Sequence, residues 1–545
     1  MIQPNLLRAA SLSLLIWIFA GCQTVQPVAE ETTEPEVAES ETPVTDQKSA
    51  ARWYNLNLSI DPENQSISGY TEILIEAGDH QLKKTDLDLH DNFVVSEVSV
   101  DGQSLEFSHE TGRLTVKFDD PLRRHERVKV RVYYEGKPVV SPNPPWSGGF
   151  VWEEDDSGNH LIGVTTQTAG GQIWFPAMDH PALRPDSAAI NITVPKPYFV
   201  ASNGLLRDIT ESGEYQTFHW STKYPIHTYN ITMNVGMYEE VEKTYITENG
   251  TEMPVVFYVL PESREYADQI LDMTILKLKQ LRNYFGEYGF TDEKFGLVET
   301  SYLGMEHQTI NAYGNQFRFD TVAGREYDWL LLHELIHEWW GNLITVTDWA
   351  DFWIHEGITT YGDALFLDDF AGAEYYHAKL AEYSCQISNR SPVAPMTASG
   401  VDDVYNHDIY YKGAWFMHSL RHFTGPDLFA ETLREFALAN RYQATSSEKF
   451  RIFWKQYSGT DPLELMNIYL YSTTIPQTEI RNSGNNSWEI SIPNIETELP
   501  VDVMLSGETI RLNLGSNPVR VNSESEPVID PENWYLKNDI CFEIN

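Results

Sequence analysis

Residues 328–340, with the sequence DWLLLHELIHEWW, contain neither glycine nor proline, and apolar residues surround the polar ones. This pattern predicts a helix. On a helix His333 and His337, four residues apart, lie one turn from each other on the same face. Two imidazoles so placed can bind one tetrahedral metal ion, and Glu334, next to the first, can reach a water on that ion as a general base.

A catalytic zinc site needs a third protein ligand and leaves its fourth position to water. The segment WIHEGITTY, residues 353–361, offers the carboxylate of Glu356, and the eighteen residues between His337 and Glu356 leave room for a loop and a return. Its neighbour His355 is not expected to be a ligand, because adjacent helical residues face in different directions. The alternative for the two histidines alone is a helix whose imidazoles are solvated or hydrogen-bonded, and Glu356 argues against it.

The hydrophobic pattern changes twice along the chain. Between residues 53 and 242, short runs of alternating polar and apolar residues are separated by Gly, Pro, Asn and Asp, which predicts a mainly β domain. Residues 266–285 have apolar residues at helical spacing, Leu276 among them, and more helix-like segments follow up to residue 469. Alternation returns in 479–545, which predicts a small β-sandwich. We therefore expect an α+β protein of several domains.

The N-terminus predicts export. Arg8 precedes an apolar run at 12–20, which is much shorter than the roughly 20 residues that span a bilayer. Small residues follow, directly before Cys22, and the segment resembles a bacterial lipoprotein signal. We expect Cys22 to be lipidated, with an ordinary signal peptide as the alternative. Residues 23–50 are acidic and lack aromatic residues, which predicts a disordered tether. Gln23 resembles the pattern of lipoproteins sent to the outer membrane, so we expect the chain in the cell envelope, facing the periplasm or the exterior.

Charge and cysteine content exclude other classes of protein. The formal net charge of −42 argues against nucleic-acid binding, because phosphate repels like charge. Besides Cys22 the chain has only Cys385 and Cys541, which form no CxxC pair, so a thiolate metal site is not expected. A disulfide between them is compatible with export, but we expect two buried free thiols.

The metal-site motifs together resemble a known family. They are similar to the motifs of the aminopeptidase N family of gluzincin metallopeptidases. The matching motifs are HExxH followed after eighteen residues by Glu, WGN at 340–342 and WIHEG at 353–357. His355 stands where that family usually has Asn. The resemblance implies one zinc ion per chain. It also implies the residues around the ion: His333, His337 and Glu356 as ligands, and Glu334 as general base.

Residues 303–308, LGMEHQ, resemble the GxMEN exopeptidase signature of the same family. The resemblance assigns Glu306 to the α-ammonium of the substrate, and places Gly304 and Met305 beside the bound peptide, in strand fashion. His307 replaces the usual Asn. A carboxylate near the metal is what an enzyme needs to recognise a free N-terminus.

Two further segments carry the resemblance. Residues 165–181 are similar to a family segment in which a Glu or Gln, twelve residues before an Asp, contacts the substrate N-terminus. Here Gln167 lies twelve residues before Asp179, and the similarity assigns it that contact. Gln172 stands where the family has Arg. Residues 408–415, DIYYKGAW, resemble the YxKG segment, which assigns the catalytic tyrosine to Tyr410. A phenol aimed at the developing oxyanion would stabilise the tetrahedral intermediate.

The resemblance implies a thermolysin-like, mainly α catalytic domain and a zinc-dependent aminopeptidase acting on peptides with a free N-terminus. The expected segments are a signal peptide at 1–21, an acidic tether at 22–50, an N-terminal β domain at 51–245, the zinc domain at 246–472 and a C-terminal β-sandwich at 473–545. One alternative is a zinc endopeptidase of the same fold. Another is a peptide-binding surface lipoprotein without catalysis, which should have lost Glu334, a ligand or Tyr410. The large helical C-terminal domain of many relatives has no counterpart here, so we expect a more open cleft.

Overall fold

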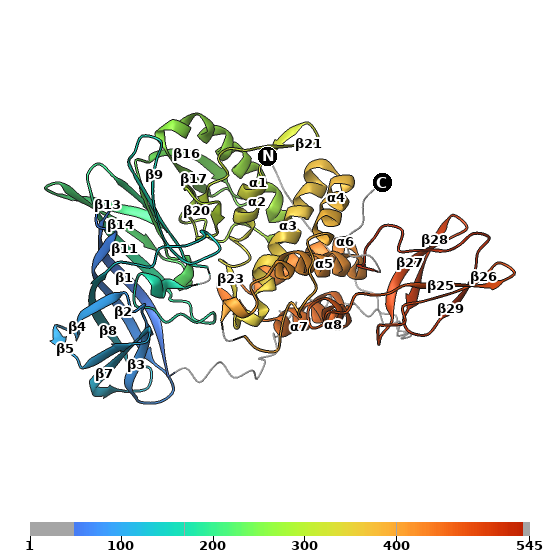
Figure 1. The fold of residues 1–545 in the computed structure, drawn as a ribbon, viewed down its shortest axis with the longest axis horizontal. Helices are drawn as coiled ribbons and strands as arrows, with labels where there is room; N and C mark the ends of the chain where they lie inside the picture. Colours follow the sequence, from blue (N-terminus) through green and yellow to red (C-terminus); the bar gives the residue numbers. More distant parts are fainter. Residues whose placement is uncertain (1–47, 168, 399, 538–545) are drawn as a thin grey trace, which may run out of the picture. The chain divides into compact units, whose positions relative to one another are not determined.

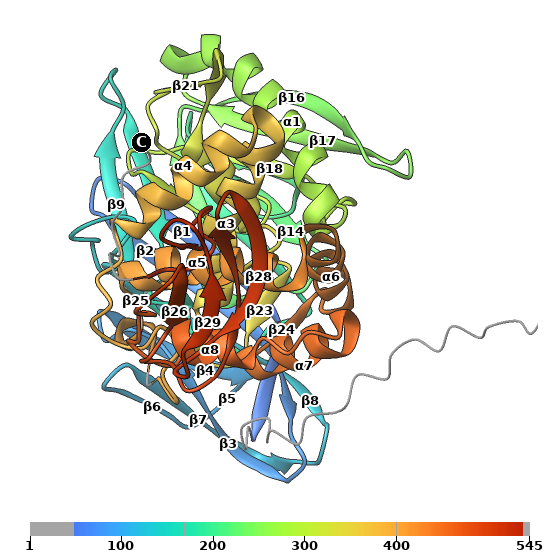
Figure 2. The ribbon, with the colours of Figure 1, turned by 90° about the vertical axis from the view of Figure 1, so that its right-hand side faces the viewer.

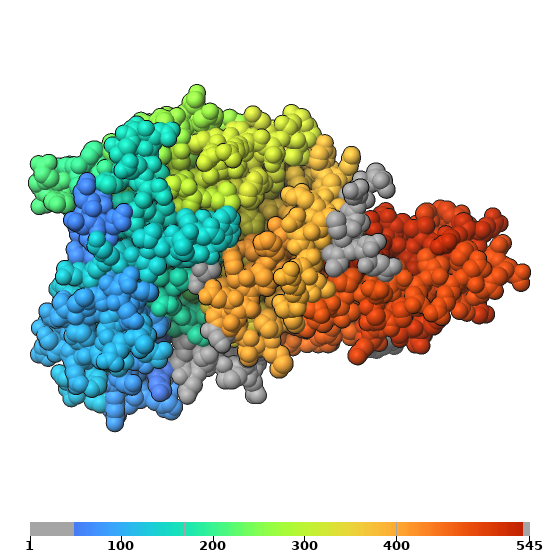
Figure 3. Space-filling view, in the orientation of Figure 1, coloured from blue at the N-terminus to red at the C-terminus, as the bar shows by residue number. Residues whose placement is uncertain are grey.

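The computed structural model describes residues 48–537, apart from 168 and 399. Strands form the first part of the chain, helices dominate the middle and strands return at the end, as predicted (Figure 1). On the face drawn in Figure 3, the blue-to-cyan, green-to-orange and red parts each cover a contiguous area. The predicted signal peptide, Cys22, the tether up to residue 47 and Cys541 lie outside the described residues. Among those described, no helix is both long and apolar enough for a membrane span.

The N-terminal part is built on an eight-stranded sheet. Its strand β1 pairs antiparallel with β2 and parallel with β11. The alternation in β1 buries Tyr54, Leu56 and Leu58 on one face. In sheet order the strands are β13 (Leu205–Ser212), β14 (Tyr215–Thr222), β11 (Ser187–Pro195), β1 (Ser49–Asp61), β2 (Ser66–Ala77), β8 (Arg127–Gly136), β4 (Phe93–Val100) and β5 (Gln103–Ser104). Two smaller sheets are β12 (Phe199–Ser202), β15 (Met233–Gly236), β10 (His160–Thr165), β9 (Gly149–Glu154), and β3 (Leu82–Asp88), β7 (Arg113–Leu122), β6 (Phe107–Glu110).

The middle part combines one mixed sheet with the helices. In order, its strands are β16 (Glu239–Ile246), β17 (Glu252–Val259), β18 (Phe295–Glu299), β20 (Asn311–Tyr313) and the edge strand β19 (Gly304–Met305). Short pairs are β21 (Asp320–Val322) with β22 (Arg325–Tyr327), and β23 (Ile344–Val346) with β24 (Gln443–Thr445). The helices are α1 (Ala267–Phe285), α2 (Trp329–Ile336), α3 (Trp353–Ala371), α4 (Ala373–Ser384), α5 (His407–Thr424), α6 (Pro426–Ala439), α7 (Ser447–Ser458) and α8 (Leu463–Tyr469). The helical spacing of 266–285 is confirmed by α1, although Leu276 is 43% exposed.

Helix α2 is shorter than the predicted 328–340. It begins after Asp328, whose carboxylate caps it by accepting from the backbone N–H of Leu331 at 3.0 Å. It ends at Ile336, and the chain turns at Gly341, whose φ of +126° favours glycine. His337 directly follows α2 and keeps a helical backbone, with φ −58° and ψ −20°. The one-turn spacing of the two histidines therefore survives the early end of the helix.

The C-terminal strands form two three-stranded sheets, which face the viewer in Figure 2. They are β25 (Glu479–Gly484), β26 (Ser487–Ser491), β29 (Val519–Asn522), and β28 (Glu508–Leu514), β27 (Leu499–Leu505), β30 (Val528–Ile529). Trp534, after the last strand, stacks on His418 and His422 of α5, with ring centroids 4.7 and 4.8 Å apart. The Ser419 hydroxyl donates to the Trp534 carbonyl at 2.8 Å. Helix α5 and the C-terminal strands therefore pack together.

Cys385 differs from its prediction. It directly follows α4, is exposed, and is disulfide-bonded. The expectation of a buried free thiol is therefore wrong for this residue. Pairing depends on which Cα atoms the fold brings within about 7 Å, and sequence spacing does not contain that information.

Candidate metal centre

Three side chains converge on one point: His333 and His337 at the end of α2, and Glu356 in the first turn of α3. The Nε2 atoms of the histidines lie 3.2 Å apart. Oε2 of Glu356 lies 3.3 Å from Nε2 of His337 and 3.8 Å from Nε2 of His333. Ligand atoms about 2.1 Å from a tetrahedral ion stand about 3.4 Å from one another, so these three atoms fit such an ion. Within the described part of the chain, no other group of three His, Cys, Asp or Glu has a metal-binding arrangement.

The far side of each imidazole is held by a hydrogen-bond partner. Nδ1 of His333 lies 3.2 Å from Oδ2 of Asp363 on α3, and Nδ1 of His337 lies 2.9 Å from the carbonyl of Trp340. A proton on each Nδ1 leaves Nε2 free to bind a metal. Oε2 of Glu356 is buried and has no hydrogen-bond partner among the described residues, as expected of an oxygen reserved for an ion.

The electrostatics of the cluster favour positive charge at its centre. Burial by itself lowers the pKa of an imidazole, but the charge of Glu356 beside it raises the pKa of His337 to about 9. Burial raises the pKa of Glu334 to about 8. Glu306 adds a further buried carboxyl, whose pKa burial also raises. A divalent cation would satisfy this concentration of carboxyl groups, and its positive charge would favour the ionised form of Glu334, which is the form that can act as a base.

Two motif glycines bring α3 and α5 together. A β-carbon on Gly357 would lie 2.9 Å from the Cα of Gly413, and one on Gly413 would lie 2.9 Å from the Cα of Gly357. Only a residue without a side chain fits at either position at this helix spacing. Each glycine follows a predicted site residue, Glu356 on α3 and Tyr410 on α5. The contact therefore places Tyr410 beside the metal cluster, and its ring lies nearly parallel to that of His333 at a centroid distance of 6.3 Å.

Gly304 and Met305 form the edge strand β19 beside the zinc-motif helix. A β-carbon on residue 304 would lie 2.5 Å from Oε1 of Glu334 and 2.8 Å from Cδ1 of Leu330. Gly304 thus leaves the space that the Glu334 carboxyl group occupies. Met305 is buried in a small apolar cluster that includes Tyr302.

Glu306 and Gln167 meet at the metal cluster, although 139 residues separate them. Nε2 of Gln167 donates to Oε1 of Glu306 at 3.1 Å and to Oε1 of Glu356 at 2.8 Å. The Glu306 side chain is buried, and the backbone carbonyl of Glu306 accepts a hydrogen bond from Nδ2 of Asn342 at 2.9 Å. His307 is also buried, with Nε2 3.4 Å from the hydroxyl of Thr166. The N-terminal β domain therefore contributes a polar side chain directly to the centre.

The loop that carries Gln167 is fixed by Asp179. Its carboxylate accepts from the backbone N–H groups of Gly171 at 3.1 Å and Gln172 at 2.7 Å. Gly170 has a φ of +73°, and a β-carbon there would lie 2.5 Å from Oδ2 of Asp179. The loop therefore closes tightly around this carboxylate. The spacing between Gln167 and Asp179, which the sequence comparison used only as a motif, thus has a structural reason.

Three residues of the centre did not emerge from the sequence as site residues: Asp363, Tyr405 and, in its loop-closing role, Asp179. Asp363 had a signal, because it follows Glu356 by two helical turns and so lies on the same face of α3. Tyr405 precedes α5; its hydroxyl accepts from that of Tyr410 at 3.0 Å and donates to Oε1 of Gln167 at 3.3 Å. A tyrosine in a loop gave no comparable signal.

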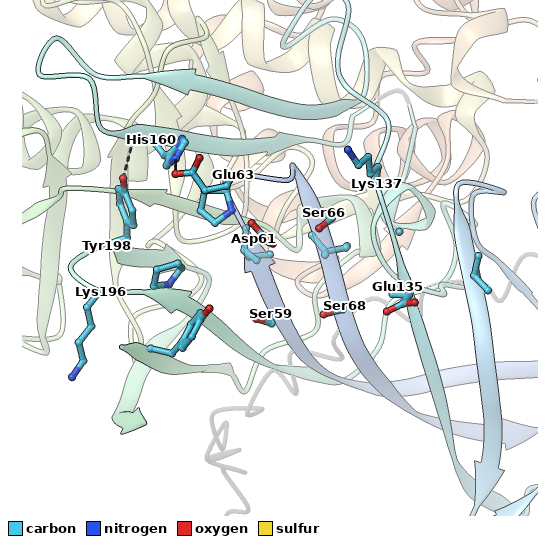
Figure 4. Close-up of a pocket in the computed structure, with 17 residues that line it drawn as sticks. Ser59, Asp61, Glu63, Ser66, Ser68, Glu135, Lys137, His160, Lys196 and Tyr198 are labelled. Atoms are coloured by element: carbon cyan, nitrogen blue, oxygen red, sulfur yellow. Dashed lines mark hydrogen bonds and ion pairs between the residues drawn. The ribbon is translucent and has the colours of Figure 1, made fainter. Parts of the chain in front are cut away.

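A groove of about 750 Å³ lies on the N-terminal β domain, away from these residues (Figure 4). Nε2 of His160 in this groove lies 3.3 Å from Oε1 of Glu63, and its backbone N–H donates to the hydroxyl of Tyr198 at 3.3 Å. None of the metal-centre residues lines the groove. His160 therefore has hydrogen-bond partners within the groove.

Two family models match the chain. One, described as the peptidase family M1 domain, matches residues 271–469, and the other, described as the peptidase M1 N-terminal domain, matches 50–230. Together they cover more than two thirds of the sequence.

Individual relatives agree with these models. Aminopeptidase B of Mus musculus is 26% identical over 374 residues, 64% of this chain and 54% of that protein. Aminopeptidase 2 of Candida albicans is 20% identical over 421 residues, 73% of this chain and 44% of that protein. The chain thus spans about half the length of these curated relatives. An M1 zinc metallopeptidase of Deinococcus radiodurans, in a mutant form bound to a Tyr-Ser-Ala substrate, has a similar fold, with a TM-score of 0.66 and 22% identity over 79% of this chain and 96% of that one.

Proposed function

The chain belongs to peptidase family M1, and on that basis we propose that it is a zinc-dependent aminopeptidase, which removes the first residue of peptides with a free N-terminus. His333, His337 and Glu356 would hold the zinc ion. The observation that supports exopeptidase activity best is the contact between Glu306, Gln167 and the metal ligand Glu356. A carboxylate and an amide oxygen this close to the metal can bind an α-ammonium and place the first carbonyl at the centre.

When bound, zinc supplies Lewis acidity for the scissile carbonyl and makes water a nucleophile at neutral pH. The carboxylate of Glu334 takes the proton of the attacking water and later passes it to the leaving amine. Tyr410 donates a hydrogen bond from its hydroxyl group to the developing oxyanion. Burial raises the pKa of Tyr410 well above its ordinary value, so the phenol keeps its proton. Losing one oxyanion donor of this kind typically costs about 3 kcal/mol in the transition state.

The role of Glu306 tests the proposed function. The wild-type protein should hydrolyse an aminoacyl anilide with a free amine and leave its N-acetylated form intact. Glu306→Ala should lower kcat/KM on the free-amine substrate by about 100-fold, because a charged partner of the ammonium is lost. Glu262→Ala, at an exposed acidic position, should retain wild-type rates. Wild-type cleavage of N-acetylated peptides at internal bonds would instead indicate the endopeptidase, and zinc binding without hydrolysis would indicate the inactive peptide-binding protein.

Gly304→Ala should displace the Glu334 carboxyl group, since the new methyl group would lie 2.5 Å from Oε1. A base displaced by about 1 Å costs roughly 100-fold in kcat. The metal content should stay at the wild-type level, because the three atoms nearest to the new methyl group belong to Glu334 and Leu330 and not to a ligand. The matched control is Gly400→Ala, whose β-carbon meets nothing within 4 Å. Steady-state kinetics and metal analysis of both variants measure this, and an unimpaired Gly304→Ala enzyme would disprove the steric role.

We also propose that Cys22 is the lipid-bearing first residue of an exported chain in the cell envelope, on the outer membrane. The support is the short apolar run at 12–20 and the small residues before the cysteine. In bacteria that produce the full chain, Cys22→Ser should move the protein from the membrane to the soluble fraction and prevent incorporation of labelled palmitate. Palmitate on the Cys22→Ser protein would refute the assignment.

A further inference from the structure

Tyr405 connects the two ends of the metal centre. Its hydroxyl accepts from Tyr410 at 3.0 Å and donates to Oε1 of Gln167 at 3.3 Å. The amide of Gln167 continues the chain, since its Nε2 donates to Glu306 at 3.1 Å and to Glu356 at 2.8 Å. All the hydrogen bonds run in one direction, from the phenol at the oxyanion end to the carboxylates at the amine end.

The direction of these bonds conflicts with catalysis. A phenol has one proton, so Tyr410 cannot donate to Tyr405 and to an oxyanion at the same time. Its hydroxyl must turn before it can act, and the oxygen of Tyr410 can then accept a hydrogen bond from Tyr405. Tyr405 can provide this bond only if it gives up Oε1 of Gln167. Whether Oε1 of Gln167 is available as an acceptor therefore determines whether Tyr405 donates to Gln167 or to Tyr410.

We propose that Tyr405 is a positioning residue, which reverses its hydrogen bond when a substrate amine binds, and so couples amine recognition to the oxyanion donor. An α-ammonium held by Glu306 competes for Oε1 of Gln167, the acceptor that Tyr405 uses. Tyr405 then turns its O–H to the oxygen of Tyr410, and Tyr410 turns its own to the oxyanion. No proton is transferred between the phenols, because only two O–H bonds rotate. A hydroxyl that accepts one hydrogen bond donates the next one more strongly.

The surroundings of Tyr405 suit this role. Its ring packs against Phe352 at a centroid distance of 6.1 Å and edge-on to Tyr410 at 6.2 Å. The next residue, Asn406, caps α5 by accepting from the backbone N–H of Asp408 at 2.8 Å. The ring is therefore fixed between α3 and α5, and the hydroxyl proton alone is free to change partners.

The inference rests on the proposed aminopeptidase activity, and two substrates with Tyr405→Phe test it. On an aminoacyl anilide, the variant should lose about 10-fold in kcat with less than a twofold change in KM. The des-amino analogue has no ammonium group that could bind Oε1 of Gln167. On this substrate the rate of Tyr405→Phe should therefore lie within twofold of the wild-type rate. In a Tyr410→Phe background, the same substitution should cost less than twofold, because the donor that it assists is already gone.

Tyr411→Phe is the matched control, since Tyr411 lies on the same helix with its ring against Tyr383, at a centroid distance of 5.3 Å. Metal content and melting temperature report folding, and Tyr405→Leu repeats the comparison if the Phe variant does not accumulate. Equal losses on both substrates, or additive losses with Tyr410→Phe, would overturn the inference. A wild-type protein that does not cleave the aminoacyl anilide would overturn the proposed function instead.

Discussion

Replacing Glu334 by Gln should lower peptide hydrolysis by at least about 1,000-fold and leave the metal in place. The amide has nearly the shape of the carboxyl group but cannot take a proton from water. The three ligand atoms belong to other side chains, His333, His337 and Glu356, and keep their positions. Rates on an aminoacyl anilide and zinc content by elemental analysis measure the two halves of the prediction.

Glu338→Gln is the matched control for this loss. Glu338 lies four residues further along the same segment and is also buried, and burial raises its pKa to about 8. It is thus largely protonated at pH 7, and glutamine resembles that neutral form. Its Oε1 accepts from the backbone N–H of Thr309 at 2.8 Å, a bond that glutamine can keep. Activity close to wild type is expected for this variant. Substantial turnover by Glu334→Gln would remove Glu334 from the role of base.

Replacing Glu356 by Ala should empty the metal site and abolish activity. One of three converging ligands is lost, and zinc affinity should fall by more than the roughly 10- to 100-fold that removal of an outer partner costs. Because zinc binds the folded state only, it stabilises the wild-type fold, and a chelator should lower its melting temperature. The same chelator should leave the melting temperature of Glu356→Ala unchanged.

Asp363→Asn provides the graded comparison. It removes the carboxylate that holds Nδ1 of His333 but keeps all three ligands. Its zinc affinity should fall between those of wild type and Glu356→Ala, by about 10- to 100-fold. Competition with a chelator of known affinity orders the three proteins. A Glu356→Ala protein that retains one zinc ion at wild-type affinity would exclude Glu356 as a ligand.

The sequence was sufficient for features encoded in local spacing. Helical periodicity placed His333 and His337 on one face, and strand alternation predicted the β parts before and after the helices. The convergence of Glu356 on the histidines followed from coordination chemistry, which requires a third ligand. The approach of Gln167 and Glu306 was implied only by the family resemblance, since no periodic pattern connects segments 139 residues apart.

What the sequence did not reveal depends on tertiary contacts. Tyr405 meets Gln167 through the fold alone, since the two residues are 238 positions apart in the chain. Cys385 follows α4 and is disulfide-bonded, and no sequence motif marks it as a bonded cysteine. The early end of α2 reflects a turn at Gly341 that helix propensity alone does not predict.

The stacking of Trp534 on α5 has a mechanical consequence. Tyr410 lies in the first turn of this helix, while His418 and His422, which the indole covers, lie two and three turns further on. A helix is stiff along its axis, so a tilt applied at one end also moves the other. A displacement of the C-terminal strands would therefore be transmitted along α5 to Tyr410, the proposed oxyanion donor.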